Sequence, residues 1–276
     1  MAESILRGNL RKMVTHHNKP VKYELVLGEQ RVGMNDYIGK HVQLNYLGEI
    51  NCIHCGRKTS KSFNQGYCFP CMRSLAECDS CILKPETCHF DAGTCRDPDW
   101  AMGHCFQDHY VYLANSSGLK VGITRSSQIP TRWMDQGATQ ALPIFKVKNR
   151  YLSGLLEVEL KQHVSDRTDW RKMLKGVAEH VDLSHTRDRL MNECGRAIAE
   201  LSERFGEDAI IQLEDAQVVE IEYPMLTYPD KVKSFNLDKG EVVEGTLEGI
   251  KGQYLVFNSG VINVRKYGGY LVEVVL

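Results

Sequence analysis

Nine of the ten cysteines in this 276-residue chain lie between Cys52 and Cys105. Two C-x2-C pairs open this stretch, Cys52 with Cys55 and Cys68 with Cys71, and twelve residues separate them. Such spacing brings four thiolates around one tetrahedral ion, as in a zinc ribbon. If the four thiols bound no metal, this spacing would have to be a coincidence. We therefore predict a structural zinc site that replaces a hydrophobic core in this part of the chain.

A second group of cysteines follows the first along the chain. Its members are Cys78, Cys81, Cys88 and Cys95. We predict a second zinc on these four, but their looser spacing also allows an iron–sulfur cluster, or an exchange of one ligand for Cys105. Neither group has the histidines and nearby glutamate of a catalytic zinc, so both sites are predicted to be structural.

The remaining composition is that of a folded intracellular protein. Hydrophobic residues make up 42% of the chain and charged residues 25%, so a buried core is expected. No apolar run reaches the roughly 20 residues of a membrane helix, and the first residues lack the apolar stretch of a signal peptide. Because a cytosol keeps thiols reduced, the clustered cysteines also favour metal binding. We predict a cytoplasmic protein with no membrane partner.

A net charge of -1 conceals two blocks of opposite sign. Residues 110–175 contain eleven Lys and Arg against five acids, a net +6, whereas residues 176–230 contain thirteen acids against four Arg, a net -9. A phosphate backbone is attracted by the first block and repelled by the second, so we predict a nucleic-acid surface on the first. The predicted contacts are Arg125, Arg132, Lys146, Lys148 and Arg150.

Hydrophobic patterns divide the chain into five segments and predict an α+β fold built from several modules. Residues 1–50 alternate apolar and polar side chains and are predicted to be β-rich, and residues 51–107 form the cysteine-rich zinc module. Residues 108–180 predict an α/β domain with the order β, β, α, β, α. Residues 181–215 form an acidic helical segment. In residues 216–276, stretches of alternating apolar and polar side chains are separated by glycine-rich turns, which predicts a small β module.

One amphipathic helix is predicted within the acidic segment, with Thr186 as its N-cap and Gly206 just past its end. Its apolar face carries Leu190, Cys194, Ile198, Leu201 and Phe205. Packing of this face on the protein's own core is favoured over a role as an interface.

Two short motifs in the basic segment resemble those of the GIY-YIG nuclease superfamily. The first corresponds to Tyr110-Val-Tyr112, and the second to Lys120-Val-Gly122, in the form of the phage-type subgroup with K-I-G-I-T. The resemblance runs from Tyr110 to the end of the second predicted helix and covers about a fifth of the chain. It implies the nuclease fold of that superfamily for residues 108–180.

The same resemblance implies hydrolysis of phosphodiesters with Mg²⁺ or Mn²⁺. Arg132 corresponds to the family's arginine and would clamp a phosphate, while Glu157 corresponds to its metal-binding glutamate. Because Lys120 replaces the tyrosine of the second motif, the general base stays open, and a tyrosine could serve only with a lowered pKa. The candidates are Tyr112, Tyr110 and His163.

Over the whole chain, the sequence resembles a bacterial domain-of-unknown-function family in which a cysteine module directly precedes the sequence HYVYLANSSGLKVGITR. This arrangement implies that the two modules form one working unit. The leading hypothesis is a zinc-containing, metal-dependent endonuclease that acts on DNA or RNA. The alternatives are a DNA- or RNA-binding module that keeps the fold without cutting, and an adaptor protein that uses the acidic helix.

Overall fold

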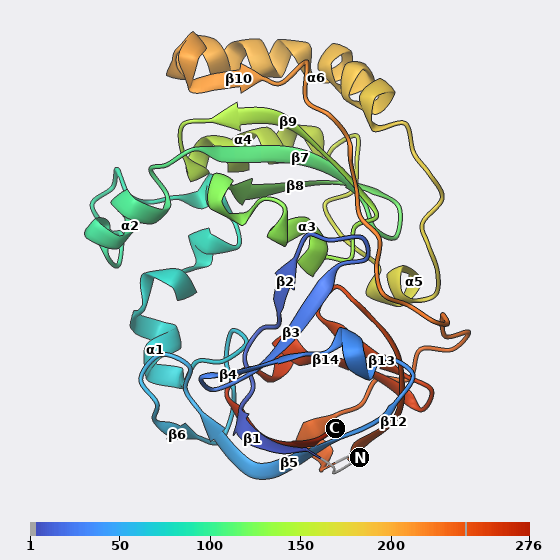
Figure 1. Cartoon of the computed structure of the whole chain (residues 1–276). Coiled ribbons are helices and arrows are strands. Elements are labelled where there is room, and N and C mark those ends of the chain that lie inside the picture. Colours follow the sequence, from blue (N-terminus) through green and yellow to red (C-terminus); the bar gives the residue numbers. More distant parts are fainter. Residues whose placement is uncertain (1–3, 241) are drawn as a thin grey trace.

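The computed structural model describes residues 4–240 and 242–276. Figure 1 shows two lobes, one above the other: an upper sheet covered by helices and a lower, β-rich body, with the cysteine-rich residues along one side of both. The predicted mixed α/β architecture with several sheets is confirmed at this level. Within the described residues, no helix combines the length and the apolar character needed to span a membrane.

The upper lobe is built on a five-stranded antiparallel sheet. Its main path is β10 (Ile210–Gln212), β9 (Gln140–Val147), β7 (His109–Asn115) and β8 (Leu119–Arg125), and β11 (Val219–Glu220) also pairs with β9. Helix α3 (Thr131–Asp135) follows β8, and α4 (Arg150–Leu160) follows β9. The predicted order β, β, α, β, α is therefore confirmed.

Helix α4 packs against one face of this sheet. Its buried residues Leu152, Leu156 and Leu160 recur every four positions, so they form one apolar stripe. The side chain of Asn149 accepts a hydrogen bond from the amide of Leu152 at 2.9 Å and caps the helix N-terminus.

Helix α6 (Leu183–Phe205) lies over α4 and the same sheet face (Figure 1). It begins one turn earlier than predicted, because Asp182 accepts a hydrogen bond from the amide of His185 at 2.9 Å and serves as N-cap in place of Thr186. The C-cap is Gly206 at φ 98°, as predicted.

The predicted apolar face of α6 packs on the protein's own core, as expected. Leu190 and Cys194 are buried in the core cluster of α4 and the sheet. Ile198, Leu201 and Phe205 are partly buried against the same cluster.

The lower lobe joins the two ends of the chain in one sheet. Its path is β1 (Ile5–Asn9), β15 (Tyr270–Val275), β5 (His41–Asn51), β12 (Val243–Lys251), β13 (Tyr254–Phe257) and β14 (Gly260–Asn263), with β6 (Lys58–Thr59) on β5. A second sheet consists of β2 (Val14–His16), β3 (Lys22–Leu27) and β4 (Gln30–Gly33). The β-rich segments predicted at the two chain ends thus share one core, since each alone would leave apolar strand faces and unpaired edges in water.

The cysteine module contains short helices and turns. They are α1 (Phe69–Ser74), η2 (Ala76–Cys78), η3 (Ser80–Ile82), η4 (Pro85–Thr87) and α2 (Pro98–His104). Two further short helices that matter below are η8 (Val264–Tyr267) and α5 (Trp170–Leu174). Helix α1 lies beside the lower lobe and α2 beside the upper sheet, on the same side of the molecule (Figure 1).

The module docks on the upper lobe through a glycine of α4. A Cβ atom built on Gly154 would lie 2.6 Å from the amide nitrogen of Glu86 and 2.6 Å from Cβ of Pro85. Helix α4 and η4 can pack this closely only because residue 154 has no side chain.

We predict that Gly154→Ala loosens this contact and lowers the free energy of unfolding by about 1 to 3 kcal/mol, as overpacking does. The matched control is Gly195→Ala in α6, where an added Cβ meets no atom within 4 Å. Alanine there should raise stability by about 0.5 to 1 kcal/mol. Urea unfolding of both variants measures the two changes, and equal effects of the same sign would contradict the close contact at Gly154.

Candidate functional site

The first four cysteines converge on one point. The sulfur atoms of Cys52, Cys55, Cys68 and Cys71 all lie within 4.8 Å of one another, and those of Cys55 and Cys68 are 3.8 Å apart. Zn–S bonds of about 2.3 Å in a tetrahedron put sulfur atoms roughly 3.8 Å apart, so the four thiols could hold a zinc ion as predicted.

The surrounding backbone favours the thiolate form. Burial opposes the charge on Cys52, but the amides of Cys55, Cys68 and His54 outweigh it and lower the pKa of this thiol to about 6. Gly56 adopts φ 72° and donates its amide to the carbonyl of Cys52 at 2.9 Å, which closes the first turn. Thiolate character is what a zinc ligand requires.

The remaining cysteines of the module have two different environments. Cys81, Cys88, Cys95 and Cys105 line one cavity of about 20 Å³. Cys78 does not line it. The thiol of Cys78 instead forms a hydrogen bond with Asn64 and interacts with the charge of Cys52, in the first cluster. Cys105, the alternative ligand, therefore lies with Cys81, Cys88 and Cys95, and the first choice Cys78 lies apart.

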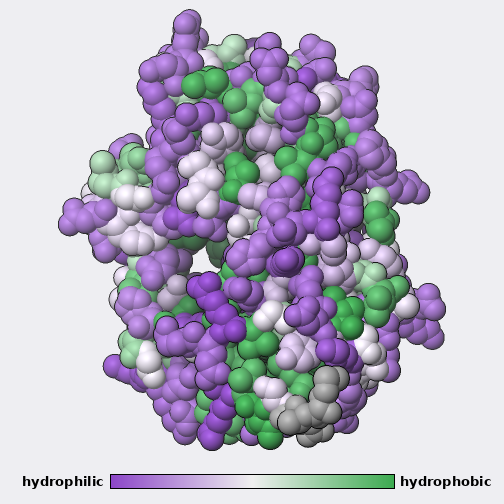
Figure 2. Space-filling view, in the orientation of Figure 1, coloured by the Kyte–Doolittle hydropathy of each residue, from purple (hydrophilic) through white to green (hydrophobic). Residues whose placement is uncertain are grey.

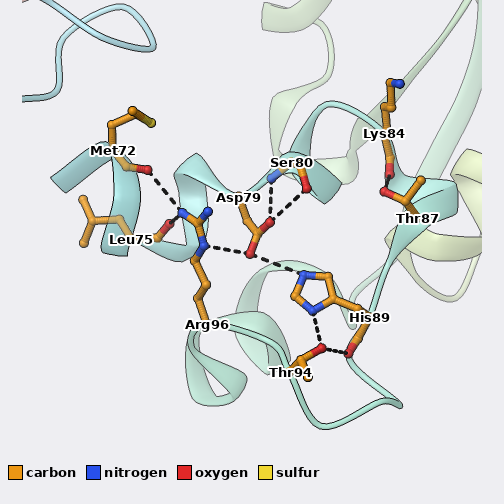
Figure 3. Close-up of polar contacts among 9 residues, drawn as sticks. All are labelled: Met72, Leu75, Asp79, Ser80, Lys84, Thr87, His89, Thr94 and Arg96. Atoms are coloured by element: carbon orange, nitrogen blue, oxygen red, sulfur yellow. Dashed lines mark hydrogen bonds and ion pairs between the residues drawn. The ribbon is translucent and has the colours of Figure 1, made fainter. Parts of the chain in front are cut away.

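A network of ion pairs borders this cavity (Figure 3). Asp79 accepts a hydrogen bond from the amide of Ser80 at 2.6 Å and pairs with Arg96 at 3.0 Å and His89 at 3.3 Å. Arg96 also donates to the carbonyls of Met72 and Leu75 at 3.2 and 3.1 Å. Asp79, Cys81 and His89 have ligand atoms within 4.8 Å of one another, but Asp79 and His89 already satisfy each other. The network clamps this half of the module on α1.

A second, larger cavity of about 370 Å³ lies where the cysteine module meets both lobes. Five predicted residues line it, from β7, β8, α3 and α4. They are Tyr112, Lys120, Gly122, Arg132 and Glu157. Two predicted nucleic-acid contacts, Arg125 and Arg150, line it as well.

Gly122 has a direct steric role in this cavity. A Cβ atom at this position would lie 2.7 Å from the hydroxyl oxygen of Tyr112, on the neighbouring strand. The ring of Tyr112 can therefore lie across Gly122, and its hydroxyl donates to Oε1 of Gln136 at 3.0 Å. Burial raises the pKa of Tyr112, although Arg132 opposes the shift. The lowered pKa that a tyrosine base requires is not found here.

Lys120 and Arg132 are cations without an ion-pair partner among the described residues. Lys120 is only 4% exposed, and burial together with Arg132 lowers its pKa to about 8. Glu157 and Asp166 oppose that shift. A buried charge without an ion-pair partner costs free energy, which is why burial lowers the pKa of this lysine.

Carboxylates complete the cavity. Burial raises the pKa of Glu157, and the charge of Asp166 raises it further, whereas Lys161 and Lys120 lower it. Asp166 and Asp135 also line the cavity but carried no signal in the sequence. Two neighbouring carboxylates, Glu157 and Asp166, are ligands of the type that a hard divalent cation prefers.

The cysteine module forms one wall of the cavity. Ile82, Leu83, Pro85 and His104 line it. Arg125 donates to Nδ1 of His104 at 2.7 Å, and Arg150 binds the carbonyl of Ile82. The amide of Arg150 also donates to the carbonyl of Cys105 at 2.8 Å. These bonds join the module to the ends of β8 and α4.

The other predicted site residues do not line this cavity. Tyr110 lies opposite Lys146 on β9, and Lys146 pairs with Asp108 at 2.7 Å. Lys148 pairs with Asp208 at 2.6 Å. His163 pairs with Glu193 of α6 at 3.1 Å. Two of the predicted phosphate contacts and the base candidate His163 thus have ion-pair partners outside the cavity, and the base candidate Tyr110 does not line it.

We predict that the folded protein gains stability relative to Lys120→Met as the pH rises. In the unfolded chain Lys120 keeps its proton up to the ordinary lysine pKa of 10.5, whereas in the folded protein it releases the proton near pH 8. The unfolded state therefore binds more protons in this window, and stability rises. The difference should grow by about 2 kcal/mol between roughly pH 7.5 and 9.5. Chemical unfolding at both pH values measures it, and a constant difference would show that Lys120 titrates normally.

Comparison with known proteins gives a family and no activity. No curated protein matches the chain, and no solved structure matches it. The sequence profile described as "Protein of unknown function (DUF2797)" matches residues 39–272, which include the cysteine module and every residue that lines the larger cavity except Lys12. The chain belongs to this family, DUF2797.

Proposed function

We propose that the 370 Å³ cavity binds a phosphodiester of nucleic acid and hydrolyses it with Mg²⁺ or Mn²⁺, in the manner of GIY-YIG nucleases. One observation carries this proposal. Lys120 and Arg132, which have no ion-pair partner among the described residues, share the cavity with the carboxylate of Glu157. Cations for a phosphate and carboxylates for a hard metal ion are the two requirements of this chemistry.

Each side chain has a role in the proposed reaction. When bound, the divalent metal would stabilise charge on the phosphate and the leaving oxygen, and Glu157 and Asp166 would hold it. Arg132 would donate two hydrogen bonds to the phosphate oxygens, and Lys120 would add a point charge. The protonated hydroxyl of Tyr112 can exchange Gln136 for a phosphate oxygen and so orient the substrate.

A second candidate function is binding of nucleic acid without cleavage. It is favoured by the state of the three base candidates, since Tyr112 keeps its proton and His163 pairs with Glu193. Tyr110 does not line the cavity. An adaptor role for α6 has less support, because its apolar face is covered by the protein's own core.

For the metal content we propose two zinc ions, one on Cys52, Cys55, Cys68 and Cys71 and one on Cys81, Cys88, Cys95 and Cys105. Support for the second set comes from the one cavity that these four cysteines line. Their sulfur atoms would have to move closer together on metal binding, because among the described residues they do not form a group within 4.8 Å of one another. The second zinc would lie behind the wall that Ile82 and His104 contribute to the larger cavity.

We expect two zinc ions per chain in the purified protein, measured by elemental analysis. Cys52→Ser and Cys105→Ser should each reduce the count to one, because a lost thiolate removes much of the binding free energy. Cys78→Ser is the control and should keep two. Iron with labile sulfide would contradict the zinc assignment, and loss of a metal in Cys78→Ser but not in Cys105→Ser would contradict the ligand set.

Cleavage should depend on Glu157. The variant Glu157→Gln keeps the side-chain shape and removes the charge that holds the metal, so we expect the rate to fall by orders of magnitude while binding persists. Glu159→Gln, on the same helix but outside the cavity, is the matched control and should cut normally. Arg132→Ala should also slow cleavage, by about 2 to 4 kcal/mol in the transition state.

The assay offers single-stranded, duplex, branched and RNA substrates with Mg²⁺ or Mn²⁺, and repeats each reaction with chelator. If the wild type binds a substrate but cuts none, the protein is a nucleic-acid-binding module and the proposed hydrolysis is wrong. Full-rate cleavage by Glu157→Gln would show that the metal lies on another carboxylate.

A further inference from the structure

Part of the lining of the larger cavity comes from outside the upper lobe. Lys12 lies between β1 and β2, and Arg265 lies in η8, so both belong to the lower lobe. Lys12 forms an ion pair with Asp135 of α3. The guanidinium of Arg265 has no ion-pair or hydrogen-bond partner among the described residues. The nuclease-like segment alone therefore lacks part of this cavity.

Arg265 faces the same charges as the predicted phosphate clamp. Burial lowers the pKa of Arg265 and the charge of Arg132 lowers it further, whereas Asp135 raises it. Two guanidinium groups from different lobes, both of which line the cavity, thus repel each other. An anion between them would turn this repulsion into two attractions.

The position of Arg265 is fixed by its neighbours. Val264 and Tyr267 on either side are buried. The amide of Val264 donates to the carbonyl of Gln253 at 2.9 Å. The side chain of Gln253 in turn donates to Oδ1 of Asp135 at 2.9 Å and accepts from the amide of Met13 at 2.9 Å. One buried glutamine, Gln253, therefore connects η8, α3 and the segment that contains Lys12 and fixes their relative positions.

The cavity is too confined for a duplex. Its lining comes from the cysteine module, with Leu83 and His104, from the upper lobe, and from the lower lobe, with Lys12 and Arg265. Its volume of about 370 Å³ lies in the range of pockets that enclose one small ligand, which accommodates a nucleotide but not stacked base pairs. Figure 2 shows an opening between the two lobes beside the cysteine module.

We propose that Arg265 of the lower lobe and Arg132 of the upper lobe bind phosphates of one strand in this cavity, and that the ligand of the cavity is single-stranded nucleic acid. This inference rests on the proposed phosphodiester site and adds its substrate class and a positioning residue. Proteins that hold single strands commonly use cationic grooves that follow the backbone.

The test measures binding by the full chain carrying Glu157→Gln, so that cleavage does not interfere. Fluorescence anisotropy compares a 12-residue single-stranded oligonucleotide, the same sequence in a duplex, and a free mononucleotide as competitor. We expect the single strand to bind at least tenfold more tightly than the duplex. The mononucleotide should compete only at far higher concentration.

Adding Arg265→Ala should weaken single-strand binding about tenfold and reduce the slope of log K against log salt by about 0.7, the value for one lost phosphate contact. Arg265→Lys should restore the salt slope and part of the affinity. Lys266→Ala, which removes an exposed charge from the same helix, is the matched control and should change affinity less than twofold. The melting temperature of Arg265→Ala should not fall, because an unpaired buried charge is removed.

Tighter duplex binding, or a salt slope unchanged by Arg265→Ala, would overturn the inference. Equal competition by the mononucleotide would mean that the occupant is a free nucleotide. If the protein cuts duplex DNA equally fast with and without Arg265→Ala, the proposed hydrolysis stands and this inference is wrong. If single-strand binding requires Arg265 but no substrate is cut, this inference stands and the proposed hydrolysis is wrong.

Discussion

The contact between the cysteine module and helix α4 creates the cavity on which every functional argument depends. Gly154 allows the backbone of Glu86 to approach the helix, and Arg150 adds hydrogen bonds to the carbonyls of Ile82 and Cys105. Without this contact the cavity would be an open face of the sheet. Metal bound in the cysteine module would therefore fix the position of one wall of the cavity without contacting a ligand in it. The cysteine module and the sheet of the upper lobe form one structural unit in this way.

The cavity holds cations that the ion pairs of the described residues do not neutralise. Outside the cavity, Lys146 pairs with Asp108 and Lys148 pairs with Asp208. The cations that line the cavity include Lys120, Arg132 and Arg265, which have no ion-pair partner among the described residues. Buried cations cost free energy unless an opposite charge joins them, so a ligand that carries phosphates would stabilise the protein.

The sequence predicted the residues whose positions depend on local order. Tyr112 and Gly122 face each other because a short turn joins their strands, and the following helices carry Arg132 and Glu157 to the same cavity. Charge counting was less informative, because the sum of +6 does not reveal which lysines have acidic partners. The motif also could not show the protonation state of Tyr112, which depends on burial.

Residues contributed by distant segments had no signal in the sequence. Lys12 and Arg265 reach the cavity because β1 pairs with β15 and joins the chain ends, a pairing that no local pattern specifies. Similarly, spacing favoured Cys78 over Cys105 for the second group. In the structure, Cys105 follows α2 and lines the same cavity as Cys81, which Cys78 does not line.

The most direct measurement is a crystal structure of the Glu157→Gln chain with a short single-stranded oligonucleotide that carries bromine for anomalous scattering. Our account predicts a phosphate within hydrogen-bond distance of the guanidinium groups of both Arg132 and Arg265, with the strand passing between the cysteine module and the lower lobe. A strand bound only outside the cavity, for example along Lys146 and Lys148, would contradict it.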